Sequence, residues 1–352
     1  MRKFVVALVV LLGAIFILGR MTEMQTIAET LRRGDWRFLL LGLGLETVWF
    51  LNIATSYRFL YRALDMEERL DRLVLLSSAA TFVNVIAPTA GMGGMAVFIS
   101  DARQRGFSSA RVTVAGVLFV LFDYAGFFII LALGLIVLFR RNNLGVGELT
   151  ASAILLAIAS FLVVLIILGM RSAGALARLL AWIVRQVNRG LQPFIHRQYL
   201  SETRAHSFAH DMAGGLQTLR RNPKNLILPL LLALTSKILL LSVLTLMFIA
   251  FKVPLTVGTL VAGFSIGYLF LIVSPTPAGI GVVEGALTLA LRSLYVPLGA
   301  AAVIALAYRG ITFWVPLLVG MLSFRWLSHS NHTLPQNIAR LETDTPLDDV
   351  QE

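Results

Sequence analysis

The sequence predicts an all-α polytopic membrane protein, and three observations support that fold class. Of the 352 residues, 57% are hydrophobic and only 14% are charged, and the mean hydropathy is +0.82. Several apolar runs reach the roughly 20 residues that a helix needs to cross a bilayer. Two further apolar regions are interrupted by proline and glycine, which is typical of broken helices inside membranes. We therefore expect about six full spans and two re-entrant broken-helix hairpins, which makes about eight hydrophobic segments.

The six expected full spans share an apolar composition and are separated by polar or basic loops. Arg2 and Lys3 precede the first of them, which has no convincing small-residue cleavage site and is interpreted as a signal anchor. Residues 1–325 are expected to form one transmembrane domain, with a first half at 4–139 and a second half at 149–324. The tail 326–352 is polar and acidic, and we expect it to be disordered. In chain order the spans cover residues 4–19, 38–60, 112–139, 149–170, 225–251 and 298–324.

The two interrupted regions cover residues 73–100 and 255–295. The first contains Asn84 and the sequence P-T-A-G-M-G-G at 88–94; the second contains S-P-T-P-A-G-I-G-V-V-E-G at 274–285. Proline cannot donate a backbone hydrogen bond, and glycine makes a continued helix costly. Broken backbone at membrane depth is tolerated only where it is packed in protein or lines a polar cavity. Both breaks are therefore candidate sites.

The distribution of arginine and lysine predicts the orientation. The connection 171–224 carries nine of them, which places it in the cytoplasm, and both termini follow to the same side. Apolar residues recur at helical spacing between 171 and 191 with arginines between them, which indicates an amphipathic helix at the cytoplasmic interface. We expect a multi-pass protein of the cell membrane that contacts membrane lipids, with anionic phospholipid favoured.

The two interrupted regions also suggest an internal duplication. The sequence P-T-A-G-M-G at 88–93 aligns with P-T-P-A-G-I-G at 275–281 if one residue is inserted. A similar spacing relates the spans that flank them. Each half then has three full crossings, so the second half would be inverted, which is typical of transporters. The two turns would meet near the membrane midplane. Chance is the alternative, since glycine and proline are common in spanning helices.

These motifs, with Tyr308-Arg309 and F-W-V-P at 313–316, resemble the transmembrane-domain family of lysylphosphatidylglycerol synthase/flippases. The resemblance covers about residues 5–325. The chain departs from the family pattern at Ala278, where a glycine is usual, and by comparison with the bifunctional members we expect no aminoacyl-transferase domain in it. The resemblance therefore implies lipid translocation rather than lysyl transfer, and no enzyme activity of the chain's own. The implied cargo is a phospholipid or a polyprenyl-phosphate-type amphiphile.

Both breaks are expected to be followed by short helices, which start near Met95 and Val282. Unpaired N–H groups at such starts favour a phosphate, and glycine lets a headgroup approach the backbone. A tight turn satisfied by neighbouring helices is the alternative. The candidate headgroup residues are Asn84, Pro88, Thr89, Gly91, Gly93, Gly94, Pro275, Thr276, Pro277, Gly279, Gly281 and Glu284.

Charged residues within the spans form a second candidate group. We expect Glu284 to pair with Arg309, because a buried carboxylate without a partner is costly. Asp123 and Arg309 lie at similar depths in the duplicated spans and are expected to face each other, while Lys237 should face the interior. Glu46 and Asn52 lie nearer the ends of their span. Structural ion pairs are the alternative for the expected network, which comprises Asp123, Lys237, Glu284, Tyr308 and Arg309.

Three arginines and two histidines are further candidate ligand residues. Arg103, Arg105 and Arg111 are expected to hold inner-leaflet phosphates, or only to determine topology. His206 and His210 are four apart, but no convincing third ligand accompanies them, so no metal is expected. There is no phosphate-binding loop, so neither a cofactor nor an ATPase is expected. The basic residues are spread between spans, so nucleic acid is not an expected partner, whereas an oligomer is possible.

Three functions are compatible with these features. The first is a lipid flippase-like transporter. The second is a membrane enzyme, or an enzyme subunit, that modifies a lipid headgroup or a lipid-linked sugar. The third is a structural or regulatory partner that recruits a separate lipid-modifying synthase.

Overall fold

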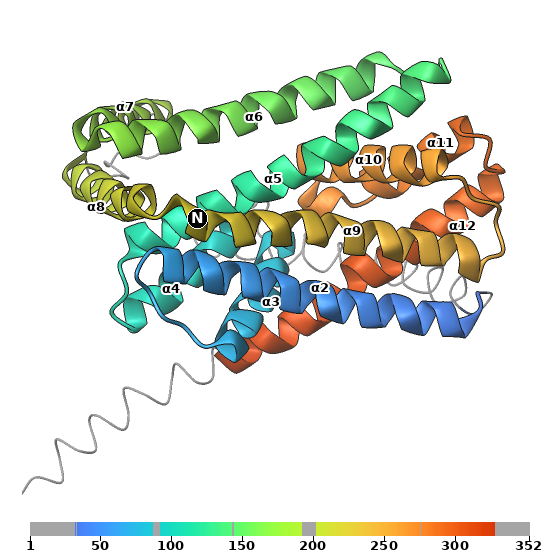
Figure 1. Cartoon of the computed structure of the whole chain (residues 1–352), viewed down its shortest axis with the longest axis horizontal. Helices are drawn as coiled ribbons and strands as arrows, with labels where there is room; N and C mark the ends of the chain where they lie inside the picture. Colours follow the sequence, from blue (N-terminus) through green and yellow to red (C-terminus); the bar gives the residue numbers. More distant parts are fainter. Residues whose placement is uncertain are drawn as a thin grey trace, which may run out of the picture. The chain divides into compact units, whose positions relative to one another are not determined.

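The computed structural model describes residue 32 and residues 34–86, 92–142, 144–191, 202–274 and 276–327. Within these ranges the chain consists of helices and their connections, without a strand (Figure 1). The expected first span and nearly all of the expected disordered tail lie outside the described residues. So do Pro88, Thr89, Gly91 and Pro275.

Within the described residues, five helices are long and apolar enough to cross a membrane, which confirms the predicted fold class. Their ends lie within three residues of the predicted spans. The last begins as α12 and passes through a π-helical segment, η3, before it continues to Leu327. The five are α2 (Trp36–Ala63), α5 (Ser109–Arg140), α6 (Val146–Arg171), the 3₁₀ turn η1 (Pro223–Leu226) with α9 (Ile227–Ala250), and α12 (Leu298–Arg309) with η3 (Gly310–Trp314).

Each interrupted region forms a pair of helices that are shorter than a membrane span. The first pair is α3 (Leu70–Ile86) and α4 (Met92–Gln104); the second is α10 (Val257–Val273) and α11 (Val282–Ser293). None exceeds 17 residues, below the roughly 20 that a full crossing needs. The second break therefore falls where proline and glycine predicted it, whereas residues 87–91, between α3 and α4, lie outside the described part of the chain. The re-entrant course through a membrane stays a prediction.

The order of helices repeats along the chain, as the duplication predicts. A long helix, a 17-residue helix, a short helix and a long helix follow one another twice, from α2 to α5 and from α9 to α12 with its extension. Leu70 and Val257, which begin the two 17-residue helices, are 187 positions apart. The expected inverted orientation of the two halves stays a prediction.

The chain forms two compact units, each assembled from several segments. Unit 1 contains the chain through Asn52, Val120–Val164 and Leu230–Trp314, and hence the hairpin α10–α11. Unit 2 contains Ile53–Phe119, Leu165–Pro229 and the chain from Val315 on, and hence the hairpin α3–α4. Each hairpin is thus packed within a different unit.

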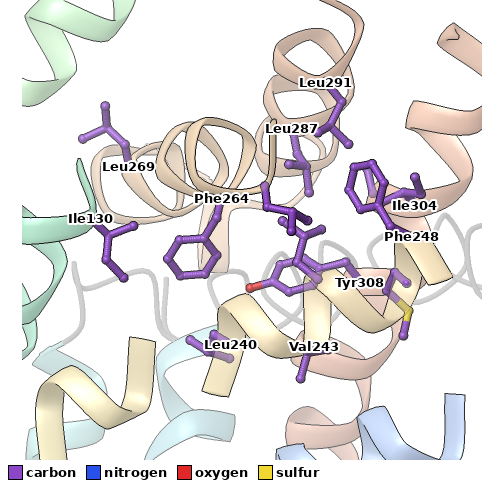
Figure 2. Packing of buried hydrophobic residues seen from close by; sticks show 14 of the residues in the cluster. Ile130, Leu240, Val243, Phe248, Phe264, Leu269, Leu287, Leu291, Ile304 and Tyr308 are labelled. Carbon is purple, nitrogen blue, oxygen red and sulfur yellow. The ribbon is translucent and has the colours of Figure 1, made fainter. Parts of the chain in front are cut away.

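Unit 1 is organised around a buried cluster of apolar side chains, most of them from α5, α9, α10, α11 and α12 (Figure 2). Phe248, Phe264 and Leu287 belong to it, and Tyr308 is its one labelled residue with a polar end. A small residue allows the hairpin helices to approach closely. A Cβ at Gly263 would lie 2.7 Å from the Leu291 side chain. This packing fixes the surroundings of the second break.

Unit 2 has its own apolar contacts. The ring of Tyr57 stacks on Phe98 and on Phe119, with centroid distances of 4.4 and 4.5 Å. In the basic connection, α7 (Ala173–Leu191) packs on α8 (Glu202–Arg221). In α7, Leu176 is buried while Arg178 is exposed, so the predicted amphipathic helix is confirmed. Its place at a membrane interface stays a prediction.

Candidate functional site

The break between α10 and α11 is a tight turn with left-handed backbone at three positions. Ala278, Gly279 and Gly281 have φ angles of 50°, 71° and 78°. Glycine is required at 279, because a Cβ there would clash with the Val283 side chain. Ala278 is an L-residue in a conformation that costs roughly 1–2 kcal/mol. A glycine at position 278, which is usual in the family that the sequence resembles, would avoid this strain.

The polar groups of this turn bond mostly to one another. The hydroxyl groups of Ser274 and Thr276 lie 2.8 Å apart, and the Thr276 hydroxyl donates to the Ile280 carbonyl at 3.1 Å. The Gly279 N–H donates to the Thr276 carbonyl at 3.0 Å. The turn therefore keeps its shape through internal hydrogen bonds, as broken backbone at membrane depth must.

Glu284 and Arg309 are bonded to each other, and each also bonds to the backbone of the turn. Glu284 Oε2 accepts from the Gly281 N–H at 2.7 Å, and its Oε1 accepts from Arg309 Nε at 2.8 Å. Arg309 Nη2 donates to the Ala278 carbonyl at 2.9 Å. The predicted Glu284–Arg309 pair is thus confirmed, and α11 begins at Val282 as predicted. Because Glu284 already places a negative charge at this helix start, a bound phosphate would have to compete with it.

The π-helical segment η3 follows Arg309 directly. Pro316 lacks the N–H that would bond the Thr312 carbonyl in an α-helix, and its ring crowds that carbonyl. A π-type turn just before the proline accommodates both effects. Phe313 in this turn stacks under Arg309, whose guanidinium carbon lies 4.5 Å from the ring centroid. The proline motif thus helps to hold the arginine against the hairpin turn.

A second charged cluster joins three helices of unit 1. Lys237 on α9 is fully buried, and its Nζ donates to Asp123 Oδ1 on α5 at 2.5 Å. Tyr268 on α10 donates through its hydroxyl to Asp123 Oδ2 at 2.9 Å, and Lys237 also bonds that hydroxyl. The Asp123 side chain remains 18% exposed. We call Asp123, Lys237 and Tyr268 the buried triad.

One sequence prediction about this cluster is wrong. Asp123 was expected to face Arg309, but its partners are Lys237 and Tyr268. The physical reason is that Arg309 is already held by Glu284 and by the hairpin turn. The prediction that Lys237 faces the interior is confirmed.

In unit 2 the first hairpin is closed by Asn84. Its Oδ1 accepts from the Gly94 N–H at 2.6 Å. A Cβ at Gly94 would lie 2.6 Å from Asn84 Nδ2 and 3.0 Å from the Ala80 carbonyl, so glycine permits the close approach of α3 and α4. The start of α4 was predicted near Met95 but lies at Met92, so Gly93 and Gly94 are inside its first turn. The predicted meeting of the two turns is not tested by this geometry.

The three arginines after the first hairpin do not share a ligand site. Arg103 donates to the Ser109 hydroxyl at 3.2 Å, and Arg111 donates to the Leu64 carbonyl at 3.3 Å. Arg105 pairs with Glu68 at 2.8 Å. Their role in holding inner-leaflet phosphates stays a prediction, and Arg105 has the most favourable surroundings for it.

Arg105 faces an open cavity of about 270 Å³ in unit 2. Basic and acidic side chains alternate around it, and a tryptophan borders it. Such a lining suits a headgroup that carries both signs of charge. The lining residues are Glu68, Arg69, Asp71, Arg72, Leu75, Arg105, Trp326 and Leu327.

Two polar residues of unit 1 gain importance only from the structure. Tyr268 was not singled out in the sequence, although a tyrosine hydroxyl in an apolar helix needs a partner when buried. Glu46 was assigned to a span end, yet it is 1% exposed. A carboxylate in an apolar run was the signal that marked it.

These features define a multi-pass α-helical membrane protein with ionisable groups buried inside its spanning helices. The chain belongs to the family described as lysylphosphatidylglycerol synthase TM region, whose family model matches residues 4–320. The family places it among membrane proteins related to lipid modification and transport. A comparison with curated protein sequences found no match.

Proposed function

We propose that this protein is a flippase-like transporter that moves a phospholipid or a polyprenyl-phosphate-type lipid between membrane leaflets. The buried triad is the observation that supports the proposal most directly. A lysine with no exposed surface in a spanning helix is expensive, and such residues mark substrate pathways by default. Lysine and tyrosine also supply the charge-assisted donors that bind a phosphate oxygen.

The triad suggests a simple exchange mechanism. In the structure, Lys237 and Tyr268 both donate to the Asp123 carboxylate. A lipid phosphate offers the same kind of acceptor, so it would replace Asp123 on these donors as the headgroup passes, while the tails stay in lipid. Asp123 is the partly exposed member and is therefore the one free to turn away. No covalent step is required.

The clamped hairpin turn would border this route. The Glu284–Arg309 pair holds the α10–α11 break in one shape, so that it presents a fixed polar wall rather than a flexible loop. The cavity next to Arg105 would receive a headgroup at the cytoplasmic face. The protein would reside in the cell membrane with both termini in the cytoplasm.

Reconstitution tests the proposal. Purified protein is placed in vesicles of phosphatidylcholine and phosphatidylglycerol that contain one fluorescent lipid, either a labelled phospholipid or a labelled polyprenyl phosphate. An external quencher then reports how fast inner-leaflet label becomes accessible. We expect faster exchange with protein than without it, for at least one lipid. Exchange equal to that of protein-free vesicles for every lipid would refute the proposal.

A matched pair of variants assigns the effect to the triad. Lys237→Met removes the buried cation and should slow exchange by about tenfold or more, which corresponds to about 1.4 kcal/mol of barrier. Lys224→Met makes the same change at an exposed position and should leave the rate unchanged. Equal exchange rates for the two variants would show that the triad does not lie on the lipid route.

The family supports a second candidate, because its description names a synthase. In that case the chain would be the membrane subunit of an enzyme that modifies lipid headgroups. A separate synthase would then co-purify in a fixed ratio, and the pair would change the mass of the lipid. Lipid exchange by the isolated chain with no change in lipid mass would favour the transporter.

A further inference from the structure

Glu46 on α2 is a buried ionisable group that the proposed mechanism does not use. The residue is 1% exposed. Neither of its carboxyl oxygens has a hydrogen-bond partner among the described residues. Three other carboxylates of unit 1 lie in the spanning helices and the hairpin: Asp123 and Glu284 are each paired with a cation, and Glu148, in the first turn of α6, accepts from the Gly145 N–H. Glu46 is therefore the exception that needs a physical explanation.

The face of α2 that carries Glu46 packs on α9 and on η3, the π-helical continuation of α12. One turn before it, a Cβ at Gly42 would lie 2.9 Å from Ile311 and 3.3 Å from Met247. One turn after it, Trp49 Nε1 donates to the Ser236 hydroxyl at 2.9 Å. Residues three and four apart share a helix face, so Glu46 is enclosed between these contacts.

The charged and titratable groups that those two helices bring to this region are Lys237, Tyr308 and Arg309. Lys237 is paired with Asp123, and Arg309 is paired with Glu284. Tyr308 belongs to the buried apolar cluster against which Leu45, the neighbour of Glu46 in the chain, and Tyr268 of the triad also pack. Figure 2 shows Tyr308 inside the apolar cluster, with its hydroxyl oxygen directed toward Phe264 and Leu240. Tyr308 thus connects the surroundings of Glu46 with those of the triad.

A charged carboxylate in this position would be costly. An ion without a partner in an apolar interior carries a penalty of several kcal/mol, whereas a neutral carboxyl group carries a much smaller one. A bound metal cation would need several more oxygen ligands. Among the described residues no cluster of metal-ligating side chains occurs. A proton is the ligand that fits the site.

We propose that Glu46 is a proton-binding site and that proton exchange at this residue is coupled to lipid movement. The coupling part rests on the proposed transport function. In the structure the proton sits on a carboxyl oxygen and keeps the site neutral while α2 is packed. In a second conformation that admits water, the proton leaves and the carboxylate is hydrated. The new charge then acts through Tyr308 on the triad, where the phosphate is bound.

The binding site is tested on the purified protein, without any transport. The carbonyl stretching band of a protonated carboxyl group is recorded by infrared spectroscopy at neutral pH. We expect this band in the wild-type protein and its loss in Glu46→Gln, which has nearly the shape of the neutral acid and should fold normally. Glu67→Gln removes an exposed carboxylate and should leave the band in place. A wild-type spectrum without the band, or an unchanged spectrum in Glu46→Gln, would refute the claim that Glu46 is a proton-binding site.

The coupling is tested in the same vesicles with an imposed pH gradient and a pH-sensitive dye inside. In the wild type, net lipid movement should reverse direction when the gradient is reversed, and dye response should accompany it. In Glu46→Gln both responses to the gradient should be lost. Lipid movement by the wild type that does not depend on the pH gradient would refute the coupling, but it would still agree with the proposed transport function. No lipid movement in the wild type, for any lipid, would refute transport and coupling together, while the infrared band would still decide the proton site.

Discussion

Removing one member of the Asp123–Lys237 pair should cost more stability than removing both. Asp123→Asn leaves the Lys237 ammonium without its counter-charge in a fully buried position. Lys237→Met leaves the Asp123 carboxylate, which is 18% exposed and can turn toward water. The double variant leaves no charge at all. We therefore predict the order of the free energies of unfolding of these three variants.

The structure gives the expected magnitudes. Breaking a buried ion pair costs roughly 3–5 kcal/mol, because an uncompensated charge remains. We expect Asp123→Asn at the upper end and Lys237→Met at the lower end of that range, since only Asp123 has water access. The double variant should lose less than either single variant, so the coupling energy should be larger than the greater of the two single losses.

Unfolding in mixed detergent and dodecyl sulfate micelles, followed by tryptophan fluorescence, measures all four proteins under the same conditions. Lys224→Met is the control for the loss of a lysine outside the buried region. If the losses of the single variants add in the double variant to within about 0.5 kcal/mol, the two residues are not coupled. The description of the triad as one electrostatic unit would then be wrong.

Three further predictions concern the hairpin turns. Ala278→Gly should relieve the left-handed strain at φ 50° and raise stability by up to about 1 kcal/mol, measured by the same unfolding assay; a clear loss would contradict the strain. Gly94→Ala should lower stability by about 1–3 kcal/mol, because the added carbon meets Asn84 and a backbone carbonyl of α3; an unchanged protein would show that the helices are not tightly packed. Arg309→Lys keeps the charge but cannot hold Glu284 and the Ala278 carbonyl at once, so it should lose about 1.5–3 kcal/mol; full stability would refute the clamp.

Several features of this protein follow from local sequence alone. Long apolar runs force helices in a bilayer, because every backbone polar group must be satisfied internally. Proline and glycine close together then interrupt a helix, as they do at Pro277 and Gly279. The Glu284–Arg309 pair could also be predicted from the sequence, since the two residues are only 25 positions apart on consecutive helices and each needs a counter-charge.

Other features depended on which helices lie side by side. Lys237 and Asp123 are 114 positions apart, and Asp123 and Tyr268 are 145 apart, so no periodicity or spacing could pair them. The duplication suggested Arg309 as the residue facing Asp123, whereas the bonded partners of Asp123 are Lys237 and Tyr268. An intramembrane charge takes the nearest free counter-charge, and packing decides which one that is.

Glu46 shows most clearly which properties follow from the sequence and which depend on the tertiary structure. The sequence by itself determined that a carboxylate stands within an apolar helix, and that such a group needs either a partner or a proton. Only the tertiary structure decided between these two outcomes, because α9 and α12 cover its face of α2 while their own cations are paired elsewhere. Burial and pairing are properties of the whole packed unit, so they cannot be obtained from any one segment of the chain.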